Sequence, residues 1–258
     1  MGEAFYQRRD EHTFVSTGHT AGPWSADTQH FGPPSALLAR ALEGVPAARD
    51  MMLARVSVDI LGPLPVAELE VSAKLERPGR SVELVSAALC CAGRAVATAR
   101  GWRIVRSNTA DVAEGESTPL PDPDQAAPYV QPEHWRSGYL DVMEWRALSG
   151  GFGTAGPASL WCRQRVDLVE GEEPTSWQRT LAVADSGNGI SGLLDPREWY
   201  FINTELTVHL HREPVGEWIG LDAATVIGPH GIGTTSSNLH DRSGQIGRAA
   251  QALLVRRR

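Results

Sequence analysis

Two short motifs in the second half of the chain contain residue types that could support chemistry. His209 and His211 form a His-x-His pair in a run that favours a strand, so both imidazoles would point to one face and could bind zinc. Glu205 and Glu213 have the same parity on that run and are possible additional ligands. A zinc site needs at least a third ligand, and such a pair on a surface strand is more often solvated. We therefore predict no metal.

The second motif is glycine-rich. Residues 187–192, GNGISG, match the glycine pattern of a dinucleotide-binding turn. That pattern is informative only between a strand and a helix of a βαβ unit, whereas here it follows a predicted helix and leads into a β-rich stretch. We expect these glycines to end the helix and to loosen a loop beside Asp185. A G-x-S-x-G nucleophile motif is absent from the sequence, which argues against the α/β-hydrolase route.

Composition and charge restrict the class of protein. The 258 residues are 41% hydrophobic and 21% charged, and 24 basic against 31 acidic residues give a formal net charge of −7. This balance argues against a nucleic-acid binder, which would normally carry a basic face. Arg256, Arg257 and Arg258 form a basic cluster. They are either solvated or a contact for the phosphates of a ligand.

Cysteine usage and the N-terminal residues indicate the compartment. Cys90 and Cys91 are adjacent in a predicted strand and Cys162 is alone, so the three do not form a disulfide framework. The polar start lacks the apolar stretch of a signal peptide, and no run reaches the ~20 apolar residues of a membrane span. We expect a soluble, cytoplasmic protein.

Two helices must position any site. Residues 33–44 begin with prolines suited to a first helical turn, and Leu37, Leu38, Ala41 and Leu42 lie on one face. A second helix is predicted from Ser176, as N-cap, to Gly187.

Each predicted helix is followed by strand-like runs with Gly, Pro and Asp at the turns. The runs are LARVSVDIL, LEVSAKLE, SVELVSAALCC and AVATARGWRIV in the first half, and TELTVHLH, EWIGLDAATVI, GIGTTSSNLH and IGRAAQALLV in the second. The halves correspond at an offset of 149–151 residues, so that Val58 matches Val208 and Gly93 matches Gly244. A helix followed by an antiparallel meander, repeated once, indicates an α+β fold whose two sheets can pair edge to edge.

The stretch between the halves differs in composition. Residues 108–132 are rich in Pro, Asp, Ala and Glu and are expected to be mostly extended. We predict an N-terminal domain at 1–107, a linker at 108–135 and a C-terminal domain at 136–258.

Three segments carry a resemblance to a known family. They are GPWSADTQHFGPPSALLARALE, LTVHLHREPVGEWIGLDA and GRAAQALLVRRR. The order and spacing of these segments resemble those of double hot-dog proteins of the acyl-CoA thioesterase II type, in particular actinobacterial ones. The resemblance implies a tandem hot-dog fold with two antiparallel sheets, each wrapped around a long helix. It also implies hydrolysis of an acyl-CoA substrate, no cofactor, and a homo-oligomer; the arginine cluster is then a candidate contact for the coenzyme A phosphates.

The resemblance also implies catalytic residues. In that family an Asp, a Ser or Thr and a Gln activate a water, and they match Asp185, Asn203 and Gln251 here. Asn203 departs from the Ser/Thr pattern, but its amide can still orient a water. Thr204 is a substitute candidate, although on a strand it should point to the other face. Without the resemblance, Asp185 could simply end a helix and Gln251 could satisfy a buried backbone group.

An oxyanion site is expected just before the first helix. His30, Phe31 and Gly32 precede it, and Gly32 would permit close backbone approach, so we expect this loop to supply the oxyanion donor or to bind substrate opposite Asp185. The acyl chain is expected in an apolar tunnel between the halves.

The internal repeat distinguishes the two halves chemically. The first-half counterparts of Asp185, Asn203 and Gln251 are Ser35, Leu53 and Arg100, respectively. None repeats the chemistry, which favours specialisation of the second half.

Two alternatives remain open. A non-catalytic acyl-CoA-binding or scaffold protein with the same fold is favoured by the Asn at position 203. A hot-dog enoyl-CoA hydratase is a lesser alternative, suggested by Asp27 and His30 before the first helix.

Overall fold

One long, mostly antiparallel sheet forms most of the molecule. The computed structural model describes residues 3–136 and 138–258. Within them, fifteen strands join in one sheet, and β3 (Ala21–Gly22) pairs with β4 (Ser25–Gln29) in a separate ribbon. The order in the large sheet is β12-β1-β2-β6-β7-β8-β5-β14-β17-β16-β15-β11-β10-β9, and β13 pairs with β17 off this path.

Each half contributes the predicted four-stranded meander. In the first half these strands are β5 (Met51–Ile60), β6 (Glu68–Arg77), β7 (Val82–Cys91) and β8 (Arg94–Val105). In the second half they are β14 (Glu205–Leu210), β15 (Ile219–Ile227), β16 (Ile232–Asp241) and β17 (Gly244–Arg257). The strand-like runs and the Gly, Pro and Asp turns between them therefore located all eight strands. They missed β13 (Trp199–Asn203), which pairs with the end of β17.

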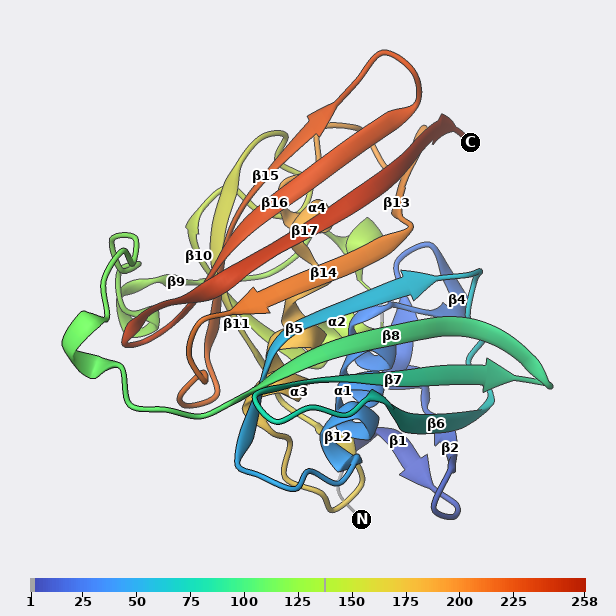
Figure 1. Ribbon diagram of the computed structural model, residues 1–258. Helices are drawn as coiled ribbons and strands as arrows, with labels where there is room; N and C mark the ends of the chain where they lie inside the picture. Colours follow the sequence, from blue (N-terminus) through green and yellow to red (C-terminus); the bar gives the residue numbers. More distant parts are fainter. Residues whose placement is uncertain (1–2, 137) are drawn as a thin grey trace.

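The two halves join edge to edge through β5 and β14, as the repeat predicted (Figure 1). Ser57 on β5 lies opposite Thr207 on β14, and these two residues are equivalent at the sequence offset. Val56 and Val58 accordingly face Val208 and Leu206. A local two-fold axis therefore passes between Ser57 and Thr207, and the pairing removes two sheet edges that would otherwise be exposed.

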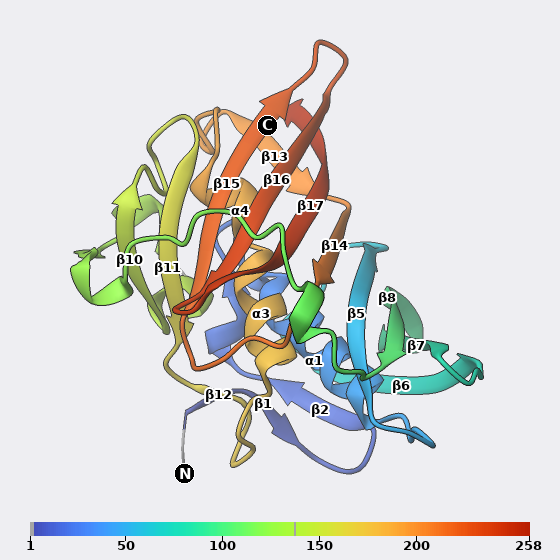
Figure 2. The ribbon, with the colours of Figure 1, turned by 60° about the vertical axis from the view of Figure 1, so that its left-hand side comes forward.

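Two helices lie side by side against one face of the sheet (Figure 2). They are α1 (Gly32–Gly44) and α3 (Ser176–Ala184). α1 packs on β6, β7 and β8, and its Leu37, Leu38 and Leu42 are at most 1% exposed. Burial of each such side chain stabilises the fold by roughly 1.5–3 kcal/mol. α3 packs on β11 and β15.

The second helix differs from its predicted span. Thr175, not Ser176, is the N-cap, because its side chain accepts a hydrogen bond from the Gln178 N–H. The helix ends at Ala184, and a separate short helix, α4 (Gly187–Ile190), follows. The glycine-rich segment is thus a buried helical turn and not the loosened loop that we predicted. The break between α3 and α4 places Asp185 and Ser186 outside both helices.

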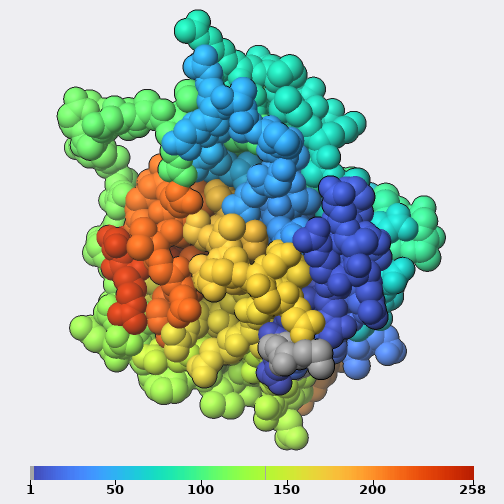
Figure 3. All heavy atoms as spheres, turned by 90° about the horizontal axis from the view of Figure 1, so that it is seen from below, coloured from blue at the N-terminus to red at the C-terminus, as the bar shows by residue number. Residues whose placement is uncertain are grey.

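Segments outside the meanders extend both ends of the sheet. β1 (Ala4–Arg8) and β2 (Thr13–Ser16) continue the first meander, and β1 pairs in parallel with β12 (Asp167–Val169). From below, the N-terminal segment and the segment around β12 and α3 lie side by side (Figure 3). β9 (Ala127–Tyr129), β10 (Met143–Ser149) and β11 (Ala158–Gln164) extend the second meander.

The predicted linker region is largely irregular. It contains the 3-10 turns η2 (Ala110–Val112) and η3 (Pro123–Gln125), and it enters the sheet at β9. Three further short elements are η1 (Gly18–Thr20), η4 (Glu133–Trp135) and α2 (Gly138–Asp141). All three cysteines are free, and none of the described helices is both long and apolar enough to cross a membrane.

Candidate active site

Asp185 lies at the break between α3 and α4. Its backbone ends α3, with its N–H bonded to the Val183 carbonyl, so the predicted helix-ending role is real. The side chain is 3% exposed and is directed towards β13 and the start of α1. A helix end thus leaves a carboxyl in the interior, where an unpartnered charge would be costly.

Both carboxyl oxygens of Asp185 have polar neighbours. Asn203 Nδ2 donates to Oδ1 at 2.8 Å, and His30 Nδ1 lies 3.1 Å from Oδ2. Asn203 comes from β13 and His30 from the segment before α1, so three distant parts of the sequence meet at this carboxyl.

Burial dominates the protonation of this group. It raises the pKa of the Asp185 carboxyl from 3.8 to about 7, against the opposing effect of the Asn203 hydrogen bond and of the backbone N–H groups of Gly32 and Phe31. Burial also lowers the pKa of His30 to about 3. His30 is therefore neutral, and its 3.1 Å contact with Asp185 is not an ion pair at neutral pH.

The start of α1 supplies donors to the same place. Gly32 N–H donates to His30 Nδ1 at 3.0 Å, and the Phe31 and Gly32 N–H groups act on the Asp185 carboxyl. Any side chain at Gly32 would collide with the Ala182 carbonyl oxygen, so glycine allows α1 to approach α3. In this structure the two N–H groups that we expected to serve an oxyanion face His30 and Asp185.

Gln251 bridges the break between the helices. From β17, its Nε2 donates to the Asp185 carbonyl at 3.1 Å, and its Oε1 accepts from the Asn188 N–H at 3.1 Å. A Cβ on Gly187 would lie 3.0 Å from Gln251 Oε1 and 2.8 Å from Ser237 Oγ. Gln251 thus contacts the backbone of Asp185 and not its carboxyl group, and the glycine makes room for it.

A cavity of about 420 Å³ opens beside the carboxyl. Asp185, Asn203, His30 and Thr204 are among its lining residues. Much of the remaining wall is apolar, from the side chains of Trp24, Phe31, Ile60, Leu61, Leu64, Trp135, Leu140, Phe152, Phe201 and Ile202. An apolar cavity with a few convergent polar groups and a carboxyl of raised pKa is typical of a small-molecule site.

The structure brings together most of the residues expected from the sequence. Asp185, Asn203 and His30 are in direct contact, and Gln251 touches the Asp185 backbone. Thr204 lines the cavity, but it is exposed and its hydroxyl donates to the Ala252 carbonyl at 3.3 Å.

Sequence reasoning missed Tyr139. Its ring stacks on His30 with centroids 3.8 Å apart, and its hydroxyl donates to the Ala182 carbonyl at 2.7 Å. The hydroxyl also lies 3.0 Å from Ser186 Oγ. Tyr139 thereby fixes the imidazole plane against the α3–α4 break. No periodic pattern marks this residue, because it lies in the four-residue helix α2.

The other sequence motifs lie elsewhere. His211 Nε2 is 3.3 Å from Glu116 Oε1, and no cluster of three metal-ligating side chains occurs within residues 3–136 and 138–258. Asp27, which with His30 suggested the hydratase alternative, is exposed on β4. The carboxyl group beside His30 is that of Asp185.

Comparison with known proteins identifies the family. The sequence model of the acyl-CoA thioesterase N-terminal domain matches residues 20–104, and that of the acyl-CoA thioesterase C-terminal domain matches residues 123–255. The chain belongs to the acyl-CoA thioesterase family. No curated protein matches it.

Several solved structures are similar to this chain over nearly their whole length, and one of them is described as having a hot-dog fold. A hot-dog protein from Alicyclobacillus acidocaldarius is 15% identical, with a TM-score of 0.75 over 97% of this chain and 95% of that one. A tesB protein from Mycobacterium avium subs paratuberculosis is 14% identical, with a TM-score of 0.70 over 97% of this chain and 95% of that one. An acyl-CoA thioesterase II from Mycobacterium marinum is 13% identical, with a TM-score of 0.66 over 98% and 96%. The expected family is therefore confirmed, and the chain has a hot-dog fold, mostly sheet with few helices.

Proposed function

We propose that this member of the acyl-CoA thioesterase family hydrolyses acyl-CoA thioesters, with Asp185 as the general base. The supporting observation is that the Asp185 carboxyl lies on the wall of a largely apolar cavity, where Asn203 donates to one of its oxygens and His30 Nδ1 lies 3.1 Å from the other. A base is most effective when its pKa is near the working pH, and burial raises the pKa of Asp185 to about 7.

The reaction needs one water. Asp185 takes a proton from the water as its oxygen attacks the thioester carbonyl carbon. The carbon–sulfur bond then breaks, the fatty acid is released, and the proton is returned to the coenzyme A thiolate. General-base catalysis of this kind contributes typically ~10²–10⁴-fold in rate.

The neighbours of Asp185 have separate roles in this proposal. Asn203 Nδ2 donates one N–H to Asp185. Its second N–H and its Oδ1, which bond no other group among the described residues, can orient the water or the thioester oxygen. Gln251 acts as a positioning residue, because its two hydrogen bonds hold the backbone on both sides of the α3–α4 break. His30 is held neutral and stacked on Tyr139, and it limits rotation of the carboxyl group.

The architecture assigned to this function has two hot-dog units. In this proposal the units comprise residues 1–107 and 136–258, joined by a linker at 108–135. Each sheet curves around its own helix, and the acyl chain occupies the cavity between them. The protein acts in the cytoplasm as a homo-oligomer.

Replacement of Asp185 tests the proposal. In Asp185→Asn the carboxamide keeps the shape and the contact with Asn203 but cannot accept the proton, so turnover should fall at least about 100-fold. Thiol release from short-, medium- and long-chain acyl-CoAs measures the effect. Asp195→Asn is the matched control. The Asp195 carboxylate is bonded to Arg197 and does not contact Asp185, so this variant should retain wild-type turnover. Retained activity in Asp185→Asn would remove Asp185 from the mechanism.

The same assay addresses the non-catalytic alternative, which is favoured by the Asn at the usual Ser/Thr position. If the wild-type protein binds a non-hydrolysable acyl-CoA analogue in calorimetry but releases no thiol at any chain length, the protein is an acyl-CoA binder and the hydrolase proposal is wrong.

A further inference from the structure

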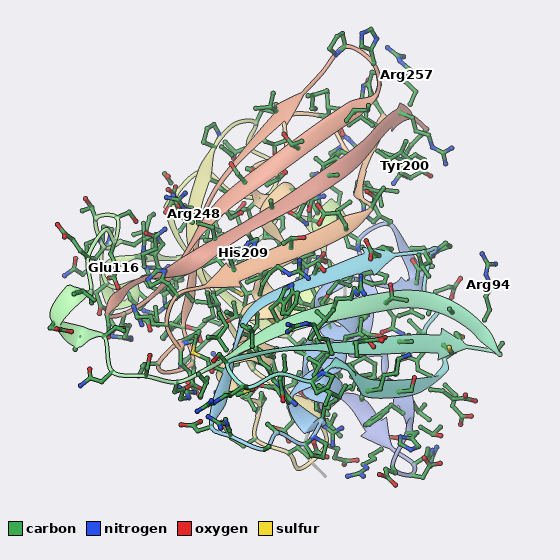
Figure 4. The ribbon with its side chains drawn as sticks, in the orientation of Figure 1. Arg94, Glu116, Tyr200, His209, Arg248 and Arg257 are labelled. Carbon is green, nitrogen blue, oxygen red and sulfur yellow. The ribbon has the colours of Figure 1, made fainter. Side chains whose placement is uncertain are left out.

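Three arginines at the end of β17 stack on aromatic side chains. The Arg256 guanidinium lies 5.5 Å from the centre of the Tyr200 ring, and that of Arg258 lies 4.6 Å from the same ring. Arg258 is also 5.5 Å from the ring of Trp24, and Arg257 is 5.0 Å from that of Trp199. Figure 4 shows Arg257 and Tyr200 together near the C-terminal end of β17. Stacking orders a guanidinium through its face and leaves its N–H edges free to bind an anion.

This cluster adjoins the cavity that contains Asp185. Arg256 is a lining residue of that cavity, yet it is exposed on the outer face of β17, which places it at the opening. Arg258 lines a neighbouring cavity of about 130 Å³, and the two cavities share Trp24 and Trp135 in their walls. Arg256 therefore borders the larger cavity where the wall is exposed.

The charges of these arginines are not neutralised within the fold. In the part of the chain that the structure describes, no carboxylate lies within 4.0 Å of the guanidinium groups of Arg256, Arg257 or Arg258. The nearby carboxylates of Asp195 and Glu198 act instead on Arg197. The whole chain has a formal charge of −7, so this positively charged patch at the opening of the cavity contrasts with the net negative charge of the protein.

The spacing along β17 fits the length of the proposed substrate. Gln251, which holds the Asp185 backbone, and Arg256 are five positions apart on β17, and five steps along a strand span ~16 Å. In coenzyme A about 13 bonds separate the sulfur from the nearest phosphorus, and an extended chain advances ~1.2 Å per bond, which also gives ~16 Å. The length of the pantetheine arm therefore matches the run of β17 from the residue that holds the Asp185 backbone to the arginine that lines the cavity.

We propose that Arg256 and Arg258, ordered by Tyr200 and Trp24, bind the phosphorylated nucleotide of coenzyme A. This inference rests on the proposed acyl-CoA substrate, and it extends the site from the thioester to the far end of that substrate. The charged end is held by the C-terminal arginines, and the pantetheine arm reaches from them to Asp185.

A paired substrate experiment tests the assignment. The double variant Arg256→Ala/Arg258→Ala should raise the KM for acyl-CoA about 10-fold or more, because it removes two charge-assisted contacts, with kcat within about twofold. The KM for the matching acyl-pantetheine, which lacks the nucleotide, should not change. Arg248→Ala is the control, because Arg248 is an exposed arginine toward the other end of β17 (Figure 4). An equal KM effect on both substrates, or an unchanged KM for acyl-CoA, would overturn the assignment.

Direct binding separates this inference from the hydrolase proposal. Calorimetry with adenosine 3′,5′-bisphosphate should show binding to the wild type that weakens as salt is raised and that is lost in the double variant. Binding without thiol release would leave the nucleotide site in place and remove only the hydrolase activity. Thiol release without nucleotide binding, or a preference for an acyl group on an acidic carrier protein, would refute the nucleotide site and leave the hydrolase in place.

Discussion

Replacing Asp185 by Asn is expected to increase stability at high pH. The folded protein holds this carboxyl at a pKa of about 7, whereas in the unfolded chain it should titrate near its ordinary value of 3.8. Between these values the folded state binds the proton more tightly than the unfolded state. The stability of the wild type therefore decreases as pH rises through this window.

The magnitude follows from the shift in pKa. A difference of about three pKa units at ~1.4 kcal/mol each makes ionisation of Asp185 cost the folded state about 4 kcal/mol at high pH. About 3 kcal/mol of this cost arises between about pH 5 and about pH 8.5. An Asn at this position resembles the protonated Asp, since it can accept from Asn203 and donate to His30 Nδ1, and it has no charge to desolvate.

Denaturant unfolding at several pH values is the assay. The free energy of unfolding of Asp185→Asn minus that of the wild type should rise by about 3 kcal/mol from about pH 5 to about pH 8.5. Burial lowers the pKa of His30 to about 3, so His30 makes the stability of both proteins rise with pH up to its ordinary pKa of 6.5, and this shared contribution cancels in the difference. Burial raises the pKa of Tyr139 well above its ordinary value, which keeps that group neutral throughout the range. Asp195→Asn is the control. Arg197 lowers the pKa of Asp195 to about 2, so its difference from the wild type should be flat over the same range.

Two results would contradict this reasoning. A difference that is independent of pH would mean that Asp185 is not buried at the expected electrostatic cost. A difference that falls with rising pH would mean that Asn203 and the N–H groups of Phe31 and Gly32 stabilise the carboxylate by more than burial destabilises it.

Two further predictions concern activity. The value of kcat/KM for thiol release should rise with pH and reach a plateau above about pH 7. In Asn203→Ala this rise should move to higher pH, because the Asp185 carboxylate loses a hydrogen-bond donor. A pH–rate profile that does not move would assign Asn203 another role. Gly187→Ala should lower kcat about 10-fold, because the new methyl group displaces Gln251. Adding Ser237→Ala should restore part of the lost kcat, because it removes the Ser237 hydroxyl, the atom closest to that methyl group. Steady-state kinetics with no such recovery would contradict the crowding argument.

Much of the fold follows from local pattern. Strict alternation located β5 and β14, because each has one buried face, and the repeat indicated that the two sheets can pair edge to edge. Only the structure showed that β5 and β14 form this junction. Two prolines after Gly32 predicted the start of α1. These features depend on neighbouring residues alone, so the sequence reveals them directly.

The site could be predicted only in part. The resemblance to acyl-CoA thioesterases indicated Asp185, Asn203 and Gln251, and the segment before α1 indicated His30. The structural reading of Gln251, that it satisfies buried backbone groups, agrees with its hydrogen bonds to the Asp185 carbonyl and the Asn188 N–H, but the sequence did not indicate which backbone groups these would be. Tyr139 was missed because its importance comes from stacking on His30, more than a hundred residues away in the sequence.

The sequence by itself determined the eight strands of the two meanders, the first helix, the repeat and the residue types available for chemistry. Tertiary structure alone decided that α3 ends at Ala184, that Asp185 is enclosed by three distant segments, and that Arg256 lies at the opening of the same cavity. The physical reason is that burial and electrostatic environment depend on which distant segments pack together. A carboxyl has an ordinary pKa in a helix facing water, and the raised pKa of Asp185 arises only when β13 and α1 exclude water from it.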